Sequence, residues 1–155
     1  MERVFLDYGT PLTAVYLFRY LGQTLPSNDD DWLTVEQNLR RAREKWGRQT
    51  KILGREGEDK RTAGKFYVTV VQAVLLFRPK TWVLNPWLEK NLEGFHHRAS
   101  RWVAGMVLKR QWDRTWLYPP IGAVLDIVGL EEIGLYIAHL QNTVAQYIAT
   151  LPIMY

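Results

Sequence analysis

The sequence predicts a mainly α-helical protein, with a short N-terminal β-hairpin followed by a bundle of about four to five helices. Two observations carry this prediction: apolar residues recur every three or four positions over long segments, and residues typical of helix starts and ends separate those segments. The chain has 155 residues, of which 47% are hydrophobic, so it can bury one core. We expect two parts: 1–28, which contains the hairpin, and a helical domain, 29–155.

The expected hairpin lies between residues 15 and 25. Aromatic residues alternate with others up to Gly22, which breaks the run, as is typical of a strand, a tight turn and a second strand. Asp29, Asp30 and Asp31 then precede Trp32. Three adjacent carboxylates could bind a divalent metal, but carboxylates also cap helix N-termini and complement the helix dipole. We favour capping, because adjacent residues diverge around a helix.

Two helices follow the aspartates. The first carries a regular apolar stripe made of Trp32, Val35, Leu39, Ala42, Trp46 and Leu53. A turn at 54–60 separates it from a second helix, expected from about Arg61 to Phe77. Its inward residues are expected to be Ala63, Phe66, Val70, Ala73, Val74 and Phe77.

The third helix begins at Asn85-Pro86, an N-cap residue followed by proline at the first helical position. Its stripe is Leu88, Leu92, Phe95, Ala99, Trp102 and Met106. Residues 111–118 alternate in a way that indicates extended structure. A short helix, 121–128, should end at Gly129, and a last helix should cover 130 to about 149. The stripe of that last helix is Ile133, Ile137, Leu140, Val144 and Ile148.

Charge is unevenly distributed along the chain. Residues 37–65 contain ten cations and four anions, whereas residues 115–155 contain three acids and no Lys or Arg. A polyanion would therefore meet the front half of the protein. A solvated helix face is the alternative explanation for the same pattern.

Several function classes lack the residues they need. The chain has no cysteine, which excludes disulfides, thiolate metal sites and Cys nucleophiles. His96 and His97 are adjacent and His139 stands alone, so no metal-ligand spacing or triad is expected among them. No cofactor is expected. The N-terminus has no signal-peptide pattern and no apolar run reaches membrane-spanning length, so we expect a soluble intracellular protein without a membrane partner, with nucleus or cytoplasm left open.

Four motifs in order resemble a known family: 18-FRYLGQTL-25, DDDW with a basic helix, 72-QAVLLFRPKTWVL-84 and 95-FHHRASRWVAG-105. This order resembles the C-terminal, primer-grip and thumb portion of reverse transcriptases of non-LTR (LINE-type) retrotransposons. The resemblance covers about 16–149. Where the family usually has Gly-Ser-Glu, this chain has Arg78, Pro79 and Lys80.

The resemblance implies roles for particular residues. Tyr20, Leu21 and Gly22 match the hairpin that supports the primer end. The cations that match the thumb surface along a duplex backbone are Arg40, Arg41, Arg43, Lys45, Arg48 and Lys51, with Arg98 and Arg101 on the third helix. The palm aspartates that bind the catalytic metals would lie before residue 1, so this chain is not expected to be an enzyme by itself.

The leading hypothesis is therefore a truncated, non-catalytic reverse-transcriptase-like fragment with residual affinity for RNA or DNA duplex. A helical module that binds a partner protein or a second copy through exposed apolar surface is one alternative. The product of a decaying element without a selected function is another.

Overall fold

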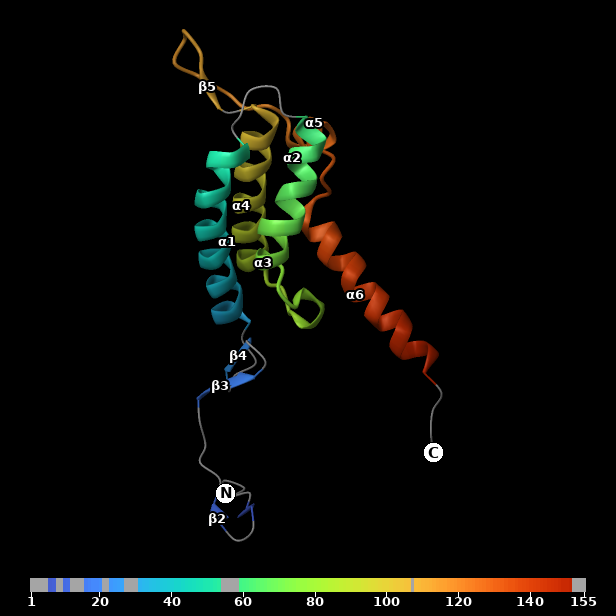
Figure 1. The fold of residues 1–155 in the computed structure, drawn as a ribbon. Coiled ribbons are helices and arrows are strands. Elements are labelled where there is room, and N and C mark those ends of the chain that lie inside the picture. The colour runs from blue at the N-terminus through green and yellow to red at the C-terminus, as the bar shows by residue number, and fades with distance from the viewer. Residues whose placement is uncertain are drawn as a thin grey trace.

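The protein folds as a mainly helical bundle in the computed structural model (Figure 1), which describes residues 6–7, 10–11, 16–20, 23–26, 31–53, 59–106 and 108–151. The predicted helical class is confirmed. Helix α1, helix α4 and a rod formed by α2, η1 and α3 contact one another, and α6 diverges from them towards the C-terminus.

Two small antiparallel pairs precede the helices. Strand β1 (Leu6–Asp7) pairs with β2 (Thr10–Pro11), and β3 (Leu17–Tyr20) pairs with β4 (Gln23–Pro26). The second pair spans the segment in which a hairpin was predicted, and residues 21 and 22 between its strands lie outside the described residues. How the hairpin sits against the helices stays a prediction.

Helix α1 (Trp32–Leu53) begins directly after Asp31. The Asp31 carbonyl accepts the Val35 N–H at 2.9 Å, so the helix starts at this residue, while capping of α1 by the Asp31 carboxylate stays a prediction. Its carboxylate reaches further: Oδ2 accepts the Val83 N–H at 2.7 Å and ties the start of α1 to the loop before α4. Asp29 and Asp30 lie outside the described residues.

The second predicted helix is one continuous rod with a π-helical middle: α2 (Lys60–Tyr67), η1 (Val68–Gln72) and α3 (Ala73–Leu75). The predicted inward stripe was only partly right beyond Ala63: Phe66 and Val70 are half-buried against the core, whereas Ala73 and Phe77 are exposed. The buried residues are instead Tyr67, Val71 and Leu75, each four positions after the last. Residues four positions apart lie on the same face of a helix, and the wider i→i+5 turns in η1 keep that spacing aligned along the rod.

Helix α4 (Pro86–Ala104) is capped at its N-terminus as the sequence predicts, and it ends at a glycine cap that was not predicted. The Asn85 side chain accepts the Leu88 N–H at 2.9 Å, and Gly105 follows in the left-handed region at φ 72°. Between the rod and α4 lies the short 3₁₀ helix η2 (Pro79–Thr81). The helix ends two residues before Met106, so Met106 does not extend its stripe.

A third antiparallel pair, β5 (Lys109–Arg110) and β6 (Trp116–Leu117), forms a hairpin that projects beyond the end of α4 (Figure 1). The prediction of extended structure over 111–118 was therefore only partly right, because 111–115 form the turn. Helix α5 (Ile121–Val128) has the predicted bounds and ends at left-handed Gly129. Helix α6 (Ile133–Thr150) starts three residues later than predicted.

The core lies where the rod, α4, the inner face of α1 and the start of α6 meet. Gly64 allows the closest approach, because a Cβ at this position would overlap the backbone carbonyl of Val128 on α5. Trp46 packs edge-on against Trp102 and Tyr67, with ring centroids 5.3 and 5.8 Å away. The core contact of these tryptophans agrees with the apolar seams predicted for them.

The outer half of α6 leaves this core. Ile133 and Ile137 are buried, but Ile148, which was predicted on the same stripe, is exposed together with Tyr147 and Leu151. Among the described residues, no helix is long and apolar enough to span a membrane.

Candidate nucleic-acid interface

The basic surface of α1 consists of six side chains, Arg40, Arg41, Arg43, Lys45, Arg48 and Lys51. Arg41 is half-buried and the other five are exposed. None of the six forms an ion pair with another described residue, since the ion pairs there join histidines to glutamates. The surface therefore keeps its positive charge available to an external anion.

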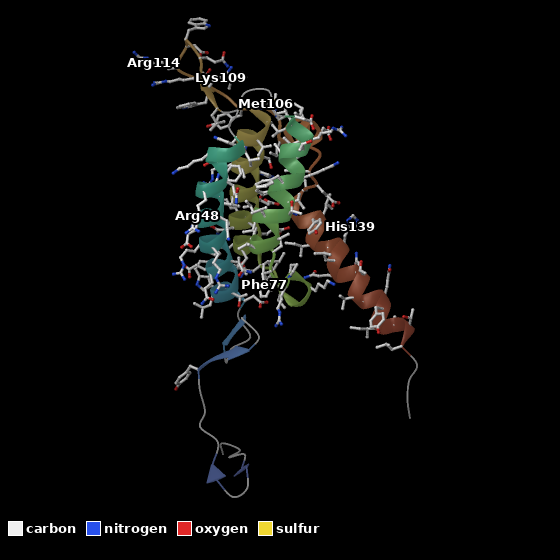
Figure 2. All side chains as sticks on the ribbon, viewed as in Figure 1. Arg48, Phe77, Met106, Lys109, Arg114 and His139 are labelled. Carbon is white, nitrogen blue, oxygen red and sulfur yellow. The ribbon has the colours of Figure 1, made fainter. Side chains whose placement is uncertain are left out.

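These six cations divide between two sides of α1. Arg41, Lys45 and Arg48 line a groove against the rod, together with Glu44, whereas Arg40, Arg43 and Lys51 do not. Figure 2 shows Arg48 on α1 and Phe77 near the end of α3. At 100° per residue, Arg40 and Lys51 point about 80° or more away from Arg41. We call the first three cations the groove set and the other three the outer set.

The groove has a volume of about 460 Å³, and its floor is mostly apolar. The floor is formed by Thr69, Val70, Ala73, Val74 and Phe77. Four of these are residues that the sequence predicted to face inward. The buried stripe of the rod lies one position further along the chain than predicted, so these four residues line the groove. The same shift explains both the error in the predicted stripe and the apolar floor of the groove.

A second hollow of about 280 Å³ continues from the groove across the rod to α6. Thr69 and Ala73 line both hollows, and Tyr136 and Leu140 of α6 complete the second. The surface of η1 and α3 that faces away from the core is therefore hollowed on two sides, towards α1 and towards α6.

The two candidate arginines of α4 differ in accessibility. Arg98 is exposed and lines a hollow of about 330 Å³ with Trp87 and Lys90. Arg101 is half-buried, and its Nε is buried without a hydrogen-bond partner among the described residues. Arg98 is thus the better placed of the two to meet a phosphate.

Sequence reasoning missed the hairpin of β5 and β6 as a candidate surface. It carries Lys109, Arg110 and Arg114 together with Trp112, Trp116 and Tyr118, and all six are exposed. Figure 2 labels Lys109 and Arg114 on this projection. The signal was present in the alternation of basic and aromatic residues over 109–118, which was used only to predict extended structure.

The histidines are structural rather than clustered. His96 is fully buried: its Nε2 lies 3.0 Å from the Glu131 carbonyl oxygen and its Nδ1 lies 3.0 Å from the Tyr67 hydroxyl. A carbonyl only accepts, so Nε2 carries the hydrogen and Nδ1 accepts from Tyr67. Burial lowers the pKa of His96 to about 4 and raises the pKa of Tyr67 far above its usual value. The pair is therefore neutral near pH 7.

His97 and His139 each contact a glutamate of the short segment between α5 and α6. His97 Nε2 lies 3.0 Å from Glu132 Oε2, and His139 Nδ1 lies 3.1 Å from Glu131 Oε1. In the part of the chain that the structure describes, no three His, Asp or Glu side chains are grouped so that they could hold a metal ion.

Of the three primer-grip-like positions, the structure describes only Tyr20. Tyr20 ends β3 and pairs with Gln23 of β4, while Leu21 and Gly22 lie outside the described residues. No family model, no curated protein and no solved structure matches the chain.

Proposed function

We propose that this chain binds nucleic-acid duplex through the basic surface of α1, in the manner of the thumb of a LINE-type reverse transcriptase. The observation that carries the proposal is the row of six cations on one exposed helix, none of which is paired with a described residue. A surface of this kind attracts phosphates by charge alone and reads no bases. The proposal is one of binding and includes no catalytic step.

The backbone at Arg78 supports the family resemblance on which the proposal draws. Arg78 lies in the left-handed region, at φ 61° and ψ 47°, where glycine is the favoured residue. Arg78 matches the position at which the reverse transcriptases usually carry glycine. The motif and the backbone conformation thus agree, although the residue differs.

Binding to phosphates predicts a specific salt dependence. Each phosphate contact releases condensed counterions, so the logarithm of the association constant should fall by about 0.9 per contact for each tenfold rise in salt. Loss of five contacts should therefore reduce the slope by about 4.5. Different duplex sequences should bind with similar affinity.

The test is fluorescence anisotropy of a labelled RNA–DNA primer-template duplex, titrated at two salt concentrations. The variant replaces Arg40, Arg41, Arg43, Lys45 and Arg48 with Gln. Binding that weakens with salt and is lost in the variant supports the proposal. A folded, monodisperse wild-type protein that does not bind the duplex would contradict it.

A second candidate function, a helical protein-interaction module, is favoured by one observation of its own. Much apolar surface is uncovered on the groove floor, at Tyr147 and Ile148 of α6, and at Leu151 directly after α6. Light scattering over a range of protein concentrations tests self-association, with Tyr147→Ser/Ile148→Ser as the variant. Self-association should survive the five Gln substitutions, whereas duplex binding should not.

A further inference from the structure

The hairpin of β5 and β6 exposes its aromatic residues to an unusual degree. Trp112 is 96% exposed, Tyr118 62% and Trp116 52%. Large aromatic side chains are normally among the most buried of a protein, and an exposed group of them marks an interaction site. Within the described residues, none of the three makes a ring contact with another aromatic side chain. Their flat faces are open to a ligand.

The hairpin places cations beside these rings. Arg110 lies directly opposite Trp116 in the antiparallel register, so both side chains point to the same face. Tyr118, two residues after Trp116, follows on that face if the strand direction continues. Lys109 and Arg114 add positive charge on the other face and at the tip. Three cations and three aromatic rings therefore share one short projection.

The tip of the hairpin is rigidly built. The Gln111 N–H donates to the Thr115 carbonyl at 2.8 Å, and the Arg114 N–H donates to the Gln111 carbonyl at 3.1 Å. Asp113 Oδ1 accepts from both the N–H and the hydroxyl of Thr115, and these bonds hold the pKa of Asp113 below its usual value. The turn is thus fixed before any ligand arrives, which lowers the entropy lost on binding.

Arg114 occupies a position at which glycine would fit without strain. Its φ is 67°, and a three-residue hairpin loop commonly places glycine at this left-handed position. An arginine here costs about 1 kcal/mol relative to a strain-free residue. This position places a cation in the turn of the hairpin, two residues from Trp112.

We infer that this hairpin binds unpaired nucleotides, with bases stacked on Trp112 and Trp116 and phosphates held by Arg110, Arg114 and Lys109. Aromatic faces interleaved with cations are the means by which proteins bind single strands without reading sequence. The site is separate from the basic surface of α1. It deepens the proposed function, because it would hold the single-stranded part of a template next to a duplex.

A membrane surface is the main competing partner for exposed tryptophans and arginines. Interfacial segments insert an apolar edge into the lipid. Here the tip sequence Trp112-Asp113-Arg114 surrounds the tryptophan with charge, and the ionised Asp113 would have to enter the anionic headgroup region. The observations therefore favour nucleic acid over lipid.

The experiment uses the full chain and two labelled probes, an oligo-dT of about 12 nucleotides and a blunt duplex. The variant is Trp112→Ala/Trp116→Ala. Its matched control is Tyr147→Ala, which removes a similarly exposed aromatic side chain from α6. Circular dichroism confirms that each variant keeps the helical fold. A stacked base quenches the indole, so the part of the tryptophan quenching that the double variant loses reports stacking on these two residues, since five other tryptophans remain.

The double variant should bind oligo-dT at least about tenfold more weakly, with blunt-duplex binding unchanged, whereas Tyr147→Ala should change neither. Equal binding of oligo-dT by wild type and double variant, or no binding by wild type, overturns the inference. So does wild-type binding to phosphatidylserine vesicles that is lost in the double variant, because the occupant is then lipid. The α1 Gln variant separates the two proposals, since it should lose blunt duplex but keep quenching by oligo-dT.

Discussion

The buried and the exposed faces of this bundle differ in how their polar groups are partnered. Where the rod, α4 and α6 meet, His96 and Tyr67 bond to each other and to the Glu131 carbonyl, and the site is neutral and closed. On α1 and on the hairpin, cations stand in solvent without ion pairs to described residues. The buried polar groups thus have their partners within the bundle, while the exposed ones are available for binding. Variants on the two faces should therefore affect different measurements.

The largest expected effect is on the stability of the buried part of the bundle. Gly64→Ala should lower the free energy of unfolding by about 3 kcal/mol, because its new Cβ would overlap the Val128 carbonyl and force α5 away from α2. Gly47→Ala is the matched control in the middle of α1, where a Cβ meets no atom within 4 Å. It should instead stabilise the protein by about 0.5–1 kcal/mol. Urea unfolding measures both; similar values for the two variants would mean that the helices tolerate separation.

The buried histidine predicts the next effect, a loss of stability in acid. The folded-state pKa of His96 is about 4 and its ordinary value is 6.5, so between these pH values the unfolded chain binds a proton that the folded chain does not. The contribution is fully present above pH 6.5 and is lost as the pH falls. Between pH 6.5 and about 4.5 it should amount to roughly 2 kcal/mol.

Urea midpoints at a series of pH values measure this loss. His96→Gln removes the titrating group but keeps a donor and an acceptor, so it should be less stable at pH 7 yet lose less on acidification. Other titratable groups face this site, namely His97, Glu131, Glu132 and Tyr67, and they remain in the variant. Equal losses in wild type and His96→Gln would assign the pH dependence to those groups.

The next prediction compares duplex binding through the outer set and through the groove set of cations on α1. Duplex phosphates reach the convex side of α1 more easily than its groove, so substitution of the outer set, Arg40, Arg43 and Lys51, with Gln should weaken duplex binding about tenfold more than substitution of the groove set. Both triple variants remove three charges, so net charge is matched. Anisotropy titrations at one salt concentration measure the difference. The reverse order would place the nucleic acid in the groove.

The sequence predicts elements best where local chemistry decides them. The bounds of α5 and the Asn85 cap of α4 were correct, because a capping side chain and a left-handed glycine act over a few residues. It failed in the rod, since Phe66, Val70 and Tyr67 are all apolar and only packing against α1 and α4 selects which stripe is buried.

The candidate site shows the same limit. Exposed cations on α1 could be predicted from the gaps in its apolar stripe. Their division into two sets could not, because it depends on where the rod lies. The hairpin was missed because Trp112 and Trp116 are apolar by type and were expected to be extended, and nothing local indicates that β5 and β6 project away from the bundle.

The smallest expected effect concerns Arg78, a half-buried residue with a left-handed backbone. Arg78→Gly removes the strain of a left-handed arginine, about 1 kcal/mol, but also removes the guanidinium that lies 5.6 Å from the Phe77 ring centroid and makes the unfolded chain more flexible. These contributions nearly cancel, so the free energy of unfolding should change by less than about 0.5 kcal/mol. Arg114→Gly, at the same backbone conformation without a neighbouring ring contact among the described residues, should gain more. Thermal unfolding of both variants beside wild type gives the comparison. If Arg78→Gly destabilises the protein, the arginine side chain contributes more than its backbone costs, and the glycine of the family motif would not be interchangeable with it in this chain.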